Sequence, residues 1–131
     1  MLRNRTSSLR RAIKGAIFGL AALAAAGVAS AQTAPRSFVA SPDIYKVIAQ
    51  NDQYVVIKSV WKPGQRDKFH SHKVFASYYL TDCSLHIFFP DVDGFSFSHV
   101  AGYSDIKGGV ISHSVQNVGK SECEIIWFEL K

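Results

Sequence analysis

The sequence lacks an apolar run long enough to cross a membrane. Its longest apolar stretch, residues 15–28, has 14 residues, whereas a membrane-spanning helix needs about 20. The stretch follows a basic, acid-free segment at residues 1–14 and precedes the small residues Ala29-Ser30-Ala31. This order is typical of a secretory signal peptide. We therefore expect residues 1–31 to be a signal peptide cleaved after Ala31, the alternative being a retained membrane anchor.

The predicted signal peptide determines the expected location of the protein. Arg10-Arg11 within the basic segment is also compatible with the twin-arginine export route. By either route we expect a periplasmic or secreted protein, with no stable membrane insertion after cleavage.

The mature part lacks an excess of charge of either sign. Five of the 15 Lys and Arg residues lie in the predicted signal peptide, which leaves ten basic and ten acidic residues after residue 31. The high isoelectric point of the whole chain, about 9.4, therefore comes from the export signal. Since no basic patch remains, we expect no nucleic-acid binding.

Cysteine is scarce, with only Cys83 and Cys123 in the chain. An exported protein meets an oxidising compartment, where an even number of cysteines permits a disulfide but does not require one. The composition alone leaves one disulfide and two buried free thiols as alternatives.

No helical periodicity persists beyond Ile44. Runs of β-branched and aromatic residues, separated by turn residues, predict short strands instead. We expect strands at residues 45–49, 54–61, 74–80, 84–89, 95–100, 110–115 and 122–130. The pattern predicts one all-β domain, a sandwich or barrel, over residues 44–131. Residues 32–43 contain two prolines and are expected to be a linker with little structure of its own.

Two histidines, His70 and His72, follow a predicted turn at Pro63-Gly64. In an extended backbone, side chains at positions i and i+2 point to the same face. Both imidazoles can therefore bind one metal ion, and His113 is the candidate for a third ligand. The alternative is a structural β-domain with histidines in its core.

These histidines lie in patterns that resemble the two motifs of the cupin superfamily, Gly-x5-His-x-His-x3/4-Glu-x6-Gly and Gly-x5-Pro-x-Gly-x2-His-x3-Asn. The resemblance covers about residues 45–131 and extends to small single-domain cupins that bacteria export. It implies a cupin-type double-stranded β-helix, which is a jelly-roll barrel with the metal inside. The first motif is matched by Gly64, His70 and His72, and the second by Gly102, His113 and Asn117.

The sequence departs from both motifs. The glutamate of the first motif falls on Ala76 or Ser77, and its closing glycine has no match near Asp82. In the second motif, Gly108 and Val110 replace the proline and the glycine. The four-ligand site of the family is therefore incomplete, and three histidines remain.

Three neutral imidazoles predict a divalent transition metal, namely Fe, Zn, Cu, Ni or Mn, bound by His70, His72 and His113. Three protein ligands leave open positions for water or substrate. In the superfamily, three-histidine iron centres are associated with thiol and diketone dioxygenases. The resemblance thus implies dioxygenase-like chemistry on a small molecule. The alternative is a non-enzymatic barrel that binds a small ligand or a partner protein, with weak or no metal.

The resemblance also carries expectations beyond the metal site. It places Cys83 and Cys123 at the same end of the barrel, away from the histidines, which implies a structural disulfide. Cupins often pair through their sheets, so a homodimer is expected by analogy.

One tyrosine is a further candidate for a role near the site, whereas the two remaining histidines are not. By alternation, either Tyr78 or Tyr79 faces inward, either as a core tyrosine or with its hydroxyl bonded to a metal-bound ligand. His86 and His99 lie outside the ligand positions of the motifs, and we expect them at the surface or half-buried.

Overall fold

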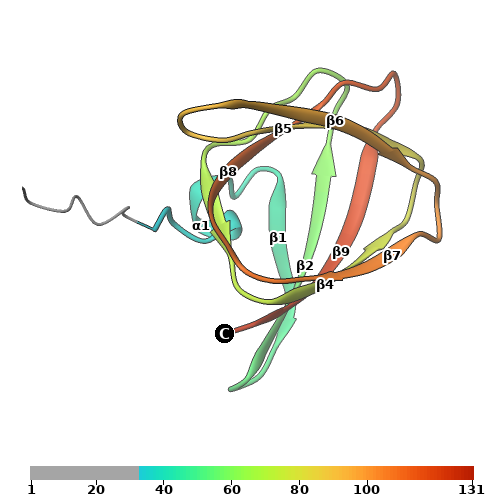
Figure 1. Ribbon diagram of the computed structural model, residues 1–131. Coiled ribbons are helices and arrows are strands. Elements are labelled where there is room, and N and C mark those ends of the chain that lie inside the picture. Colours follow the sequence, from blue (N-terminus) through green and yellow to red (C-terminus); the bar gives the residue numbers. More distant parts are fainter. Residues whose placement is uncertain (1–32) are drawn as a thin grey trace, which may run out of the picture. The chain divides into compact units, whose positions relative to one another are not determined.

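Strands dominate the part of the chain that the computed structural model describes, residues 33–131. The predicted signal peptide lies outside these residues, so its prediction stays open. Two antiparallel sheets face each other across the core (Figure 1). The elements are α1 (Ser37–Ala40), β1 (Tyr45–Gln50), β2 (Tyr54–Trp61), β3 (His70–His72), β4 (Phe75–Tyr79), β5 (Cys83–Phe88), β6 (Asp93–His99), β7 (Ser104–Lys107), β8 (Val110–Asn117) and β9 (Cys123–Leu130).

The two sheets have the strand orders β1-β2-β9-β4-β7 and β3-β8-β5-β6. Most neighbours in these orders are distant in sequence, because β9 lies between β2 and β4, and β8 lies between β3 and β5. The predicted all-β class is confirmed. In the described part of the chain, no helix has the length and apolar character needed to span a membrane.

Alternating burial along β2 and β9 creates one wall of the core. In β2, Val55, Ile57 and Trp61 face inward and are almost completely buried. Ser59 also faces inward, where its hydroxyl accepts a hydrogen bond of 2.7 Å from the indole Nε1 of Trp127 in β9. The strands thus follow the period-2 pattern that predicted them, and the inward polar residue has a partner.

A disulfide connects the two sheets. Cys83 begins β5 and Cys123 begins β9, and their Cα atoms lie 5.0 Å apart across the bond. The disulfide implied by the cupin resemblance is confirmed, and the free-thiol alternative is wrong.

The segment before β1 is not an unstructured linker, so that expectation is wrong. It contains α1 and lies along β3, where the Ser71 amide donates to the Pro35 carbonyl at 2.8 Å and the Ser71 hydroxyl donates to the Ala34 carbonyl at 2.7 Å. The Ala34 amide also donates to Ile111 in β8 at 2.9 Å. Because β3 ends its sheet, its free backbone groups need partners, and this segment provides them.

Candidate metal centre

Two motif residues shape the approach to the histidines. The Gln65 amide donates to the Lys62 carbonyl at 3.0 Å and closes a turn in which Gly64 has φ of +78°. A proline followed by a residue of positive φ is the pattern of a type II turn, where glycine is favoured. Asn117 has the expected structural role, since its amide donates to the carbonyls of Trp61 and Ser121.

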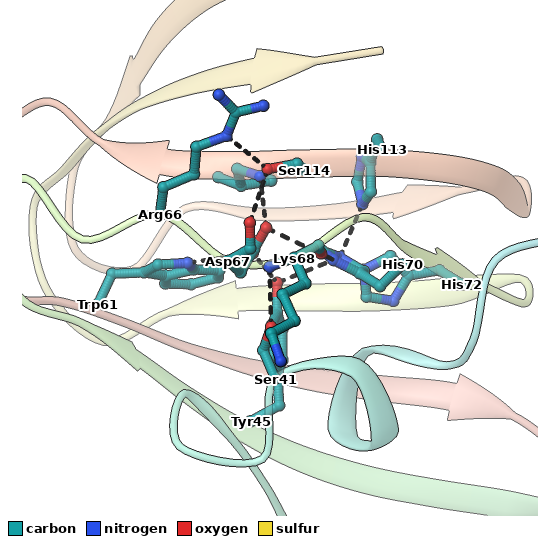
Figure 2. A network of polar contacts seen from close by, with 11 residues as sticks. Ser41, Tyr45, Trp61, Arg66, Asp67, Lys68, His70, His72, His113 and Ser114 are labelled. Carbon is teal, nitrogen blue, oxygen red and sulfur yellow. Dashed lines mark hydrogen bonds and ion pairs between the residues drawn. The ribbon is translucent and has the colours of Figure 1, made fainter. Parts of the chain in front are cut away.

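The structure brings the three predicted histidines together. His70 of β3 is paired directly opposite His113 of β8, so their side chains share the inner face of the sheet. The Nε2 atom of His70 lies 3.0 Å from Nε2 of His72 and 3.0 Å from Nε2 of His113 (Figure 2). All three side chains are buried, and they are positioned to hold a metal ion.

Two of the imidazoles are oriented through their other nitrogen. Nδ1 of His70 donates to the Lys68 carbonyl at 2.8 Å, and Nδ1 of His72 donates to a carboxylate oxygen of Glu129 at 3.3 Å. These oxygens can only accept, so both Nδ1 atoms carry the proton. The Nε2 lone pairs of both rings therefore point to the cluster, as they do in metal-binding histidines whose other nitrogen has such a partner.

Glu129 is a functional residue that the motif analysis missed. Its carboxylate is fully buried, and its second oxygen accepts a hydrogen bond of 2.6 Å from the Lys73 amide and forms an ion pair of 2.9 Å with Arg36. Arg36 belongs to the segment that was expected to be a linker. The sequence did hold a signal for Glu129, because it continues the inward positions Ile125 and Trp127 of β9.

A second buried carboxylate fixes the loop that leads to β3. Asp67 accepts hydrogen bonds from the Val115 amide at 2.6 Å, the Tyr45 hydroxyl at 2.8 Å and the Trp61 indole at 3.2 Å. Burial raises the pKa of Asp67 to about 6 even though these donors act in the opposite direction. Figure 2 shows this network beside His70, whose Nδ1 lies 3.5 Å from Asp67.

The electrostatic environment keeps His70 and His113 neutral. Burial, followed by the effect of His72, lowers the pKa of His70 to about 4. Burial and the two neighbouring histidines lower the pKa of His113 to about 2. Near pH 7 both rings are therefore neutral, and they can bind a metal without first losing a proton.

The donor set fits a transition metal. Zinc–nitrogen bonds of about 2.0–2.1 Å place tetrahedral ligands about 3.3 Å apart, and two of the Nε2–Nε2 distances here are 3.0 Å. Three imidazoles without a carboxylate ligand suit the softer divalent metals better than magnesium or calcium.

A cavity of about 170 Å³ lies beside the cluster, and His113 belongs to both. Trp127 and Ser77 also line it, and so does Tyr79. Of the two candidate tyrosines, Tyr79 is therefore the one that faces inward, whereas Tyr78 is 49% exposed. A small molecule held in the cavity would lie next to the His113 end of the cluster.

The two remaining histidines lie outside the cluster. His86 interacts with Ser96 at 2.8 Å and with Asp93 at 3.0 Å on the β5–β6 hairpin. The ring of His99 stacks on Tyr103 with 3.7 Å between centroids.

A scan against protein-family models finds no match, and neither does a search of curated proteins. Solved structures do match. A cupin domain from Bordetella pertussis Tohama I has a TM-score of 0.61 at 21% identity over 67% of this chain and 92% of its own. A Klebsiella pneumoniae protein with a double-stranded β-helix domain gives 0.52 at 18% identity, over 66% and 75%. A cupin superfamily protein from Desulfitobacterium hafniense gives 0.50 at 14% identity, over 66% and 75%. At such identities the matches establish the fold.

Proposed function

Since the domain has the cupin fold predicted from the sequence, we propose that His70, His72 and His113 bind one divalent transition metal. One observation carries this proposal. With Nδ1 protonated in His70 and His72, two Nε2 lone pairs face each other at 3.0 Å in a buried site. Two acceptors at this distance repel each other unless a cation lies between them, and a divalent metal meets that requirement.

The metal is Fe, Zn, Cu, Ni or Mn, and it gives the site a chemistry that the side chains lack. A metal with three protein ligands and open positions supplies Lewis-acid or oxygen chemistry when bound. The cavity shared with His113 can hold a small organic molecule next to these positions. We infer dioxygenase-like chemistry on a small molecule, in the periplasm or outside the cell, as the signal sequence suggests.

A second candidate function is ligand binding without turnover. The described side chains that line the cavity include no carboxylate, so no acidic residue is available there as a general base. Tyr79 is a poor base, because burial raises its pKa above that of a free tyrosine, so its hydroxyl stays protonated. A barrel that binds a small ligand, with or without metal, requires no such group.

Metal titration tests the site. Purified protein is stripped with a chelator, loaded with cobalt(II) and freed of excess metal, and the bound cobalt is measured by elemental analysis and visible absorption. We expect one cobalt ion per chain in the wild type and none in the His70→Ala/His72→Ala double variant. His86→Ala is the matched control and should keep the full amount. Equal cobalt content in the double variant and the wild type contradicts the site.

Oxygen uptake separates the two functions. Metal-loaded protein is incubated with small organic acids and thiols, and dioxygen consumption is followed before and after chelation. Consumption that stops on chelation and is absent in His70→Ala/His72→Ala supports an enzyme. If a ligand binds but no dioxygen is consumed with any of the metals, the result supports the binding function.

A further inference from the structure

The pairing of β7 with β4 places the charged residues of β7 on the same face of the sheet as buried residues of β4. In an antiparallel pair, directly opposite residues project to the same face. Lys107 is opposite Phe75, which is buried in the core, and Asp105 is opposite Ser77, which lines the cavity. Ile106 projects the other way and is 76% exposed. This reverses the usual arrangement of apolar residues inside and polar residues outside, so the inward charges need an explanation.

Lys107 brings a positive charge to the cavity beside the metal cluster. Its side chain lines the cavity, and its ammonium donates to Asp105 at 3.2 Å while remaining 52% exposed. A lysine ammonium has three donors, so two are left for a ligand or water. His113 lines the same cavity. The ammonium and the histidine cluster therefore border one space.

Most of the other side chains that line the cavity are aromatic. The volume of about 170 Å³ is close to that of an apolar cavity of about 150 Å³ that holds benzene. One six-membered ring with a small substituent therefore fills it. Seven phenylalanine, tyrosine and tryptophan side chains line it, among them Phe75, Tyr79 and Trp127.

We propose that the cavity selects a small organic acid with a flat apolar body about the size of one ring. The carboxylate binds the Lys107 ammonium at the exposed end, and the body packs against Phe75 and Trp127. The end remote from the carboxylate then lies toward His113. Only the orientation of this remote end rests on the proposed metal function. If that function holds, the remote end is the part of the substrate that reacts.

Benzoate and benzamide test the proposal, because they have the same shape and differ in charge. Both tryptophans of the chain, Trp61 and Trp127, line the cavity, so their fluorescence reports binding. In chelator-treated wild type we expect benzoate to bind about fivefold more tightly than benzamide, which is within the strength of a partly exposed ion pair. Naphthoate exceeds the volume and should bind more weakly than benzoate.

Two substitutions locate the effect. Lys107→Met keeps the apolar stem but removes the charge, so it should abolish the preference for benzoate and leave benzamide binding unchanged. Asp105→Asn removes the competing carboxylate and should strengthen benzoate binding. Lys58→Met, at an exposed ion pair on β2, is the matched control and should retain the wild-type preference.

Three results overturn the proposal: equal binding of benzoate and benzamide, a preference that survives in Lys107→Met, or no binding of either ligand at millimolar concentration. The measurement on metal-free protein keeps this test separate from the metal test. A benzoate preference without metal binding supports the proposed acid selectivity and contradicts the metal site. Metal binding without a benzoate preference supports the metal site and contradicts the acid selectivity.

Discussion

Arg36 and Glu129 form an ion pair of 2.9 Å in which the carboxylate is fully buried. Arg36 lies before the first strand and Glu129 near the end of the last one. Since Glu129 also accepts a hydrogen bond from Nδ1 of His72, the pair connects the N-terminal segment to the histidine cluster. The segment thus positions a candidate metal ligand in addition to covering the edge of β3.

Arg36→Ala should destabilise the protein and weaken metal binding. Removing the arginine leaves a buried carboxylate without its cation, which costs on the order of 3 kcal/mol for pairs of this kind. Glu129→Ala removes the acceptor of His72 and should lower metal affinity about 10–100-fold. Urea unfolding and competition with a metal-binding dye measure the two effects.

Lys58→Ala is the control for both measurements, because it breaks the exposed ion pair of 2.7 Å with Glu124 between β2 and β9. Exposed pairs contribute about 0–1 kcal/mol, and this one is not connected to the cluster. An Arg36→Ala variant as stable as Lys58→Ala, with unchanged metal affinity, contradicts the positioning role.

Asp67→Ala should unfold at markedly lower urea concentration. It removes the acceptor for the Val115 amide, the Tyr45 hydroxyl and the Trp61 indole, all of which are buried. Each buried donor left without a partner costs about 1–3 kcal/mol, so a loss on the order of 3 kcal/mol is expected. Asp82→Ala removes one acceptor, for Ala101 in an exposed turn, and should lose about 1 kcal/mol or less. Similar losses in both variants contradict the role of Asp67.

The sequence predicted the histidine cluster because its geometry is largely local. His70 and His72 share a face through the period of a strand, and the cupin resemblance supplied the partner strand of His113. Arg36 could not be assigned in the same way. Its partner depends on which sheet edge the N-terminal segment occupies, and that edge is formed by β3, more than 30 residues later in the chain.

Local composition also explains why the sequence predicts a linker at residues 32–43. The prolines and serines of residues 32–43 have a weak preference for helix or strand. This preference describes only the isolated chain, without its tertiary contacts. Composition does not show that the Ser71 amide has a partner in the Pro35 carbonyl, or that the Ser71 hydroxyl has one in the Ala34 carbonyl. Glu129 was a different case, because an acid at an inward position of an alternating strand was visible in the sequence.

Loss of the disulfide should lower stability without removing the metal. Cys83 and Cys123 are 40 residues apart, and closing a loop of that length contributes about 4 kcal/mol in the chain-entropy model. Cys83→Ser/Cys123→Ser should therefore unfold at lower urea concentration and still bind cobalt. Two reactive thiols per chain in denatured, unreduced wild type contradict the disulfide.

Acidification should destabilise the metal-free protein. His70 and His113 have pKa values of about 4 and about 2 in the fold, against an ordinary value of 6.5. Between pH 6.5 and 4 the unfolded chain therefore binds more protons at these positions, and stability falls as the pH falls. Asp67 has the opposite effect on stability. Its pKa is about 6 in the fold and 3.8 ordinarily, so its contribution to stability rises as the pH falls.

The two histidines outweigh the one aspartate, so we expect a net loss of about 2 kcal/mol between pH 7 and pH 5. Urea unfolding in the presence of a chelator measures it. In His70→Ala/His113→Ala only the Asp67 contribution remains, and stability should rise slightly over the same range. A wild type whose stability is unchanged or higher at pH 5 contradicts these pKa shifts.

If His70, His72 and His113 form a metal site, the protein should contain metal when it is purified. The full chain is expressed with its predicted signal peptide and purified from the periplasm or medium without added metal or chelator, and elemental analysis gives the metal per chain. We predict one equivalent of a transition metal in the wild type and in His86→Ala, and none in His70→Ala/His72→Ala. A wild type without metal, or a double variant with as much metal as the wild type, contradicts the account.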